Sequence, residues 1–191
     1  ILISILTCAQ DKNSTNTKNT HEIIVPDLDI PWGFTFLPDG TILITEKAGR
    51  LIHFKNGKKT EISGLPEIYV RGQGGFMDTT LHPDYKNNNL IYFSYASSDG
   101  EGDAGNTTIA SAKYSDMTLT NWKVLYKAEP NSTRGQHFGS RLQFDKNGHL
   151  FFSIGDRGNR DENPQDITRD CGKIYRINDD GSIPKDNPFY K

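Results

Sequence analysis

A histidine and an aspartate stand at the two ends of a short apolar hairpin in this sequence, and together they could abstract a proton. His137 lies within residues 134–142 (Arg-Gly-Gln-His-Phe-Gly-Ser-Arg-Leu), and Asp156 directly follows the apolar run at residues 150–154. Paired strands put the start of one strand beside the end of the next, so both side chains can meet at one edge. A neutral imidazole near pH 7 accepts a proton, and a carboxylate can fix its tautomer and stabilise its charged form. The alternative is a structural histidine and a turn aspartate that caps its own backbone.

A third polar candidate lies in a glycine-rich stretch upstream. Gln73 occupies the middle of Arg-Gly-Gln-Gly-Gly at residues 71–75. Its amide could hydrogen-bond a sugar hydroxyl, or the stretch could be a plain connector between structural units. A phosphate-binding loop is excluded because neither Lys-Ser/Thr nor a helical pattern follows the glycines.

The elements that must position these residues are predicted to be strands. From Ile23 onward no segment shows apolar residues at helical spacing, and short apolar or alternating runs are separated by turn residues. Three stretches resemble each other, at residues 32–54, 75–95 and 139–156, and the third resumes at 172–177. Each reads as strand, hairpin turn, strand, loop and third strand. Asp39-Gly40 and Asn147-Gly148 are predicted turn pairs in which both positions have positive φ.

Repeats of this length, each a small sheet, predict an all-β protein with a β-propeller fold. Nearly continuous apolar runs in the inner strands predict that both faces of these strands are buried. About three blades fit into the 191 residues, whereas propellers close with roughly 4–8 blades. Half of the ring is therefore expected to be missing, which would leave the faces of the terminal blades without a neighbour and exposed to solvent. A β-sandwich is the alternative architecture.

Metal and nucleophile patterns are weak. His53, His82 and His149 lie in strand or turn contexts, and Cys171 is interpreted as a small buried residue, so no metal ligands are assigned. The acidic, glycine-rich loop at residues 99–106 is either a flexible excursion between strands or a loose calcium-binding loop. A second long loop, at residues 159–170, follows Asp156 closely.

Composition and the first residues indicate an exported protein. The net charge of −2 and the interspersed charges favour neither a nucleic acid nor an anionic membrane as partner. Residues 1–9 resemble the remnant of a signal peptide or of a lipoprotein signal with Cys8 as the lipid-carrying residue, and they are too short to span a bilayer. Residues 10–22 are predicted to be a disordered polar tether, and residues 23–191 the N-terminal half of a propeller domain. The expected location is periplasmic or at the outer surface, with at most a lipid anchor to a membrane.

Several motifs in order resemble the glucose/sorbosone dehydrogenase family, the soluble aldose sugar dehydrogenases that use pyrroloquinoline quinone. The resemblance runs from residue 23 to residue 191, and its motifs are Pro-Trp-Gly at 31–33, Thr-Glu-Lys-Ala-Gly-Arg at 45–50, Gly-Gln-Gly-Gly-Phe-Met-Asp at 72–78, Leu-His-Pro-Asp-Tyr at 81–85, His137 with Gly-Ser-Arg-Leu at 139–142, Ile-Gly-Asp-Arg-Gly at 154–158, Gly-Lys-Ile-Tyr-Arg-Ile at 172–177 and residues 180–189. Their joint presence makes the resemblance specific.

The resemblance implies a six-bladed propeller and an assignment of roles. His137 would take the proton from the anomeric hydroxyl of an aldose while hydride passes to a quinone carbonyl. Asp156 would orient and polarise His137, and Gln73 would line the sugar and cofactor pocket. Asp161 sits near a substrate-loop position of the family, although that loop varies. The cofactor would supply the redox chemistry, and the protein would supply position and a base.

The resemblance also implies that part of the apparatus lies elsewhere. The arginine–asparagine pair and the lysine that contact the quinone, together with the calcium ligands, belong to later blades and are expected beyond Lys191. These 191 residues alone are therefore expected to be inactive, and the sugar and the electron acceptor are left open. Two other functions compete: a non-catalytic exported propeller that binds sugars or protein partners, and a calcium-dependent lactonase, which needs more carboxylate and asparagine ligands than these residues offer.

Overall fold

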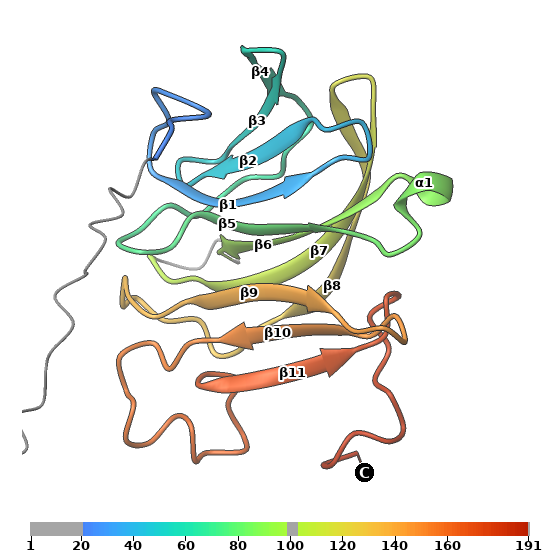
Figure 1. Ribbon diagram of the computed structural model, residues 1–191. Helices are drawn as coiled ribbons and strands as arrows, with labels where there is room; N and C mark the ends of the chain where they lie inside the picture. The colour runs from blue at the N-terminus through green and yellow to red at the C-terminus, as the bar shows by residue number, and fades with distance from the viewer. Residues whose placement is uncertain (1–20, 99–102, 191) are drawn as a thin grey trace, which may run out of the picture.

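Antiparallel sheets account for nearly all the regular structure of the protein. The computed structural model describes residues 21–98 and 103–190, and within them eleven strands form three sheets (Figure 1). The first sheet contains β1 (Pro31–Phe36), β2 (Ile42–Glu46), β3 (Arg50–Lys55) and β4 (Lys58–Ile62); the second contains β5 (Phe76–Leu81), β6 (Leu90–Ser97), β7 (Asn106–Ser115) and β8 (Thr118–Lys127); the third contains β9 (Gly139–Phe144), β10 (Leu150–Ile154) and β11 (Lys173–Ile177). A single helical turn, α1 (Tyr85–Asn88), precedes β6.

The three sheets follow one another in space as they do in the chain. Each sheet is a meander in which neighbouring strands are consecutive in sequence. The first strands of successive sheets contact each other, β1 with β5 and β5 with β9 (Figure 1). Three meanders side by side are three consecutive blades of a propeller, whereas a sandwich would have two sheets. The all-β propeller prediction is therefore confirmed.

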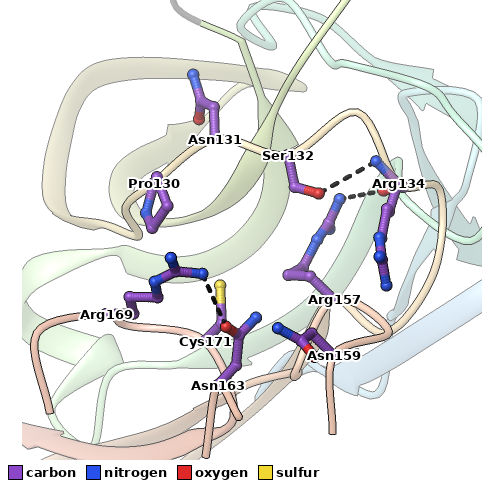
Figure 2. A pocket seen from close by; sticks show the side chains of 9 residues that line it. All are labelled: Pro130, Asn131, Ser132, Arg134, Arg157, Asn159, Asn163, Arg169 and Cys171. Carbon is purple, nitrogen blue, oxygen red and sulfur yellow. Dashed lines mark hydrogen bonds between the residues drawn. The ribbon is translucent and has the colours of Figure 1, made fainter. Parts of the chain in front are cut away.

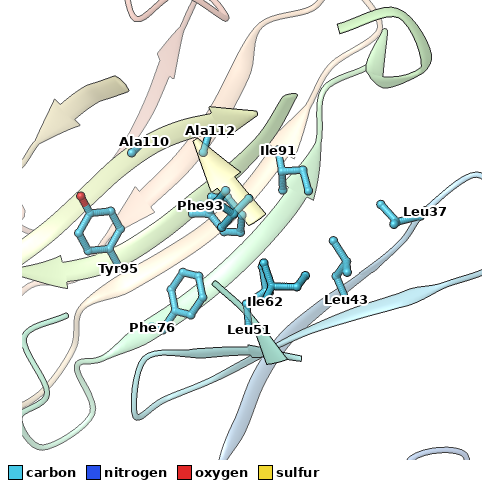
Figure 3. Close-up of a cluster of buried hydrophobic side chains, with 11 residues drawn as sticks. Leu37, Leu43, Leu51, Ile62, Phe76, Ile91, Phe93, Tyr95, Ala110 and Ala112 are labelled. Carbon is cyan, nitrogen blue, oxygen red and sulfur yellow. The ribbon is translucent and has the colours of Figure 1, made fainter. Parts of the chain in front are cut away.

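The second sheet is buried on both faces because its strands alternate between two cores. On β6, Ile91, Phe93 and Tyr95 pack in the cluster shared with the first sheet, which Figure 3 shows. Tyr92, one position out of phase, packs in the cluster shared with the third sheet. Side chains on a strand point alternately to opposite faces. The continuous apolar run of β6 therefore reflects burial on both faces, as predicted.

The third sheet departs from that expectation. Leu150 and Phe152 of β10 are buried against the second sheet, but Phe151 between them is exposed. Its apolar run therefore has only one buried face. Ile174 of β11 and Phe34 of β1 are also exposed, on the sides of their sheets that face away from β5–β8. Neighbouring blades of a closed ring cover faces of this kind.

The two hairpin turns form where the sequence predicts them, but with a different backbone. Gly40 and Gly148 have φ of 80° and 85°, whereas Asp39 and Asn147 do not have positive φ. The prediction of two positive-φ positions is therefore wrong. In the first hairpin the Leu37 N–H donates to the Thr41 carbonyl, which closes a three-residue loop. A type I turn followed by a left-handed glycine fits such a loop.

Two polar contacts join β5, the first strand of the second sheet, to the first and third sheets. Thr45 Oγ1 of β2 donates to the main-chain carbonyl of Met77 in β5. Asp78 of β5 accepts a hydrogen bond from the Leu142 N–H of β9, at 2.8 Å. Both groups are buried, so each contact satisfies polar atoms that would otherwise be costly to bury. The strand that carries Asp78 is thereby held at a fixed position relative to β9.

Predictions for the start of the chain fall mostly outside the described residues. The signal remnant at residues 1–9, Cys8 and all of the tether except residues 21 and 22 lie there, so they stay predictions. Among the residues that the structure describes, no helix is long and apolar enough to cross a membrane.

Candidate active site

The hairpin of β9 and β10 brings His137 and Asp156 together, as the sequence predicts. Ile154, the last residue of β10, is the partner of Gly139, the first residue of β9. The Gly155 N–H extends the pairing by donating to the Phe138 carbonyl at 3.1 Å. One residue further on each side, His137 Nδ1 lies 2.7 Å from Asp156 Oδ1. The pair is therefore fixed by strand register and not by a flexible loop.

The surroundings of Asp156 keep it ionised. The hydrogen bond from His137 lowers the pKa of Asp156 below its ordinary value, and the Gly158 N–H, 2.7 Å from the same oxygen, adds to the effect. An ionised carboxylate only accepts hydrogen bonds, so Nδ1 of His137 carries the proton and Nε2 holds the free lone pair. His137 Nε2 makes no hydrogen bond with the described residues, and the ring is half-exposed. This nitrogen is available to take a proton from a bound molecule.

The backbone at His137 and at Arg157, next to Asp156, adopts a conformation that residues other than glycine rarely take. His137 has φ of 54° and Arg157 has φ of 55°. Left-handed φ is uncommon for non-glycine residues and persists where surrounding contacts impose it. The imposing contacts lie at Phe138, whose ring is buried against Met77 and Ala96. Its carbonyl accepts a hydrogen bond from Thr107 Oγ1 at 2.7 Å.

Gln73 reaches the same place from the segment between β4 and β5. Its Oε1 accepts a hydrogen bond from the His137 N–H at 2.8 Å, and its own N–H donates to the Gly135 carbonyl at 2.6 Å. The side-chain Nε2 of Gln73 makes no hydrogen bond with the described residues. Gln73 is thus placed beside His137, where its carbonyl holds the histidine backbone and its NH₂ group remains to bind a ligand. Contact with a sugar or a cofactor stays a prediction.

Asp161 is not brought to the other three residues. Its side chain is 92% exposed, and its ion pair is with the neighbouring Arg160 at 3.9 Å. Within the described parts of the chain, it makes no hydrogen bond with His137, Asp156 or Gln73. Its predicted place near the substrate remains untested.

Two residues that support the pair carry no signal in the sequence. Asn163 Nδ2 donates to the main-chain carbonyl of Asp156 at 2.8 Å. Arg157 is almost fully buried, with its guanidinium carbon 3.4 Å from the centre of the Phe138 ring. An arginine between an aspartate and a glycine reads as an exposed turn residue, because arginine is seldom buried. Only the loop conformation reveals its burial.

Candidate metal ligands are few in this part of the molecule. In the ranges 21–98 and 103–190, no three His, Cys, Asp or Glu side chains are grouped so that they could hold a metal ion. The possible calcium loop at 99–106 lies partly outside the described residues. Its Asp103 is described and contacts Arg71 and the Tyr69 hydroxyl.

Fold and site together define a propeller protein with a histidine–aspartate pair at the end of a blade's inner hairpin. The family profile described as Glucose / Sorbosone dehydrogenase matches residues 28–191. The chain belongs to this family, and the resemblance found in the sequence is confirmed.

Named relatives agree with this membership. The aldose sugar dehydrogenase YliI of Escherichia coli strain K12 is 38% identical over 175 residues, which cover 89% of this chain and 47% of the relative. Quinoprotein glucose dehydrogenase B of Acinetobacter calcoaceticus is 27% identical and matches 97% of this chain and 44% of its own length. The chain thus spans about half the length of the curated relatives it matches.

Solved structures of similar proteins confirm the fold. The apo-form of the soluble aldose sugar dehydrogenase from Escherichia coli superposes with a TM-score of 0.84 at 36% identity, covering 89% of this chain and 50% of that one. A form of the aldose sugar dehydrogenase from Streptomyces coelicolor with bound PQQ gives a TM-score of 0.78 at 26% identity, covering 88% and 50%. The relatives are therefore oxidoreductases by name, and they share the fold along most of this chain.

Proposed function

We propose that the protein oxidises an aldose at its anomeric carbon, with pyrroloquinoline quinone as cofactor and His137 as general base. Membership of the glucose/sorbosone dehydrogenase family supports an oxidoreductase. The observation that carries the proposal further is the 2.7 Å contact between His137 Nδ1 and Asp156, which leaves Nε2 unpaired on a half-exposed ring. His149 Nδ1 contacts Asp145 in a similar way at 2.9 Å, so what distinguishes His137 is its half-exposed ring and its position beside Gln73.

The chemistry assigned to these residues is the removal of one proton. Nε2 of His137 accepts the proton of the anomeric hydroxyl as the C–O bond gains double-bond character. The positive charge that forms on the imidazole is stabilised by the Asp156 carboxylate at Nδ1. Gln73 holds the His137 N–H through its carbonyl, and its free NH₂ group can donate to a hydroxyl of the sugar. These three side chains thus bind, orient and deprotonate the substrate.

The residues present fit one side of a site for quinone and sugar. Pyrroloquinoline quinone, when bound, supplies the acceptor for the hydride that leaves the anomeric carbon. An amide donor at Gln73 and an unpaired imidazole nitrogen at His137 suit the polar atoms that meet at such a reacting centre. The other groups that would contact the quinone, and the calcium ligands, are expected beyond Lys191 and stay predictions. The exported location also remains a prediction.

Dye reduction by the complete natural protein, supplied with calcium, pyrroloquinoline quinone and a panel of aldoses, tests the proposal. His137→Ala should lower kcat by about 10²–10⁴-fold, the usual contribution of a general base. His149→Ala is the matched control, because His149 lies in the turn at the other end of the same hairpin and bonds Asp145. Full turnover by a folded His137→Ala protein would refute the role of His137. Sugar binding without turnover by the wild type would instead favour the non-catalytic propeller.

A further inference from the structure

A second polar site lies behind the loop that carries Asp156. A cavity of about 200 Å³ opens between the segment at residues 130–134, which follows β8, and the long loop between β10 and β11 (Figure 2). Ligand pockets for drug-sized molecules begin at about 300 Å³. The cavity is therefore the right size for a small ion together with water, and too small for an extended cofactor.

The side chain of Arg157 is the reason to expect a ligand there. It is 98% buried, at 2% exposure, and it lines the cavity. One of its nitrogens, Nη2, donates to the main-chain carbonyl of Arg134, and the guanidinium stacks on Phe138. Its Nε and Nη1 have no hydrogen-bond partner among the described residues. Burial lowers the pKa of Arg157 to about 10, so the group is still a cation at neutral pH.

The charge around the cavity is positive and largely uncompensated. Arg134 and Arg169 line it together with Arg157, and no aspartate or glutamate is among the lining residues. Arg169 is paired with Asp166 at 3.2 Å, whereas no described carboxylate contacts Arg157. A buried cation without a counter-charge is strongly unfavourable. A negatively charged group in the cavity would balance the charge of this buried guanidinium.

Neutral donors complete the lining. The Asn163 amide is buried; its oxygen accepts from Arg169 at 3.2 Å and its Nδ2 donates to the Asp156 carbonyl at 2.8 Å, so one N–H of this amide remains. Ser132 contributes a hydroxyl that accepts from the Arg134 N–H at 3.1 Å, and that hydroxyl can still donate. Guanidinium, hydroxyl and amide groups are the donors that proteins use for phosphate and sulfate.

We propose that this cavity binds a small oxyanion, whose negative charge balances that of the buried Arg157. The ligand is a free phosphate or sulfate ion, or the equivalent group of a small metabolite. This inference does not rest on sugar oxidation, because the cavity residues are separate from His137, Asp156 and Gln73. The oxyanion stabilises the loop that follows Asp156 by neutralising its buried arginine.

Thermal unfolding of the complete natural protein tests the proposal, with millimolar phosphate or sulfate compared with chloride at equal ionic strength. Low concentrations are needed because both anions also stabilise proteins non-specifically when concentrated. At 100 times its Kd, a specific anion should raise Tm by about 5 °C. Arg157→Met, which removes the charge and keeps an unbranched chain, should abolish the saturable rise. Arg160→Gln is the matched control, since Arg160 lies on the same loop, is 83% exposed and does not line the cavity.

Three outcomes would overturn the proposal: equal Tm in phosphate, sulfate and chloride, an unchanged anion response in Arg157→Met, or loss of the response in Arg160→Gln. If Arg157→Met does not fold, the site is tested by soaking crystals of the wild type in selenate. An anomalous peak within hydrogen-bonding distance of Arg157 supports the site, and a cavity without that peak refutes it. Binding of phosphorylated or sulfated small molecules in competition with inorganic phosphate then distinguishes a metabolite from the free ion.

Discussion

A methyl group added at Gly155 should disable the site without changing any residue that touches substrate. A Cβ at this position would stand 2.0 Å from the carbonyl oxygen of His137, whereas ordinary van der Waals contact begins at 3.4 Å. The oxygen belongs to the backbone, so no side-chain rotation relieves the clash. Gly155→Ala therefore forces the His137 backbone and the end of β10 apart by about 1 Å, the distance at which misplaced groups cost about 10²-fold in rate.

The expected result is a fall in kcat/KM of about 100-fold in the dye-reduction assay. In parallel, kcat is measured with cofactor and aldose both at saturating concentrations. The hydrogen-bonded Nδ1–H of His137 offers a second readout, because it should give a downfield proton resonance in the wild type that shifts or disappears in the variant. Such a shift would show that the activity is lost because His137 is displaced, since the base itself is unchanged in this variant.

Gly148→Ala separates loss of stability from displacement of the site. Gly148 lies in the turn at the opposite end of the same hairpin, has φ of 85° and would place its Cβ in open space. Alanine is strained at that φ, so this variant should lose stability yet keep kcat/KM. A folded Gly155→Ala protein with wild-type kcat/KM would refute the claim that strand register places the base.

Two further predictions concern the charges of buried or paired aspartates. The pKa of Asp156 is lowered in the folded state by the bond from His137, so its contribution to stability is present above the unfolded value of about 3.9 and is lost as the pH falls through the folded pKa. The difference in unfolding free energy between wild type and Asp156→Asn, measured by urea denaturation, should shrink from pH 7 to pH 3, and a constant difference would contradict it. Asp78→Ala should cost about 1–3 kcal/mol because it leaves the buried Leu142 N–H without its acceptor. Asp78→Asn keeps an acceptor and avoids burying a charge, so equal losses in the two variants at pH 7 would show that the bond contributes nothing.

The sequence could predict those parts of the molecule that depend on neighbouring residues in the chain, such as apolar strands and the turns between them. Apolar runs around turn pairs located the inner strands, and the antiparallel pairing of β9 with β10 brought His137 to Asp156. The fourth strands, β4 and β8, were not assigned, and neither was β7. β4 lacks the apolar signal and exposes all its residues except Ile62. β7 and β8 contain apolar residues but lie beyond residue 95, where the second repeat was taken to end. Outer strands are held by backbone hydrogen bonds to their neighbours, and such bonds leave little mark on side-chain type.

Contacts between distant segments were beyond sequence patterns. Gln73 was predicted to contact a ligand, which stays a prediction; that its carbonyl also binds the backbone of a residue 64 positions later could not be predicted. Asp161 was assigned by resemblance to a variable substrate loop; its side chain is exposed, and the assignment stays a prediction. Arg157 acquires its importance from burial, which depends on how the loop folds back over Phe138. In each case the environment of the residue depends on contacts with segments that are distant in sequence, and sequence spacing does not reveal such contacts.

The meander within each sheet also bears on how the chain acquires its structure during synthesis. Within each sheet, every strand after the first pairs with the strand made just before it, so a blade can complete soon after its last strand leaves the ribosome. Asp78 is then a carboxylate in water until Leu142 arrives, and the later segment removes it from solvent. This topology is suited to stepwise assembly in the direction of translation, in which each new blade packs against the one before it.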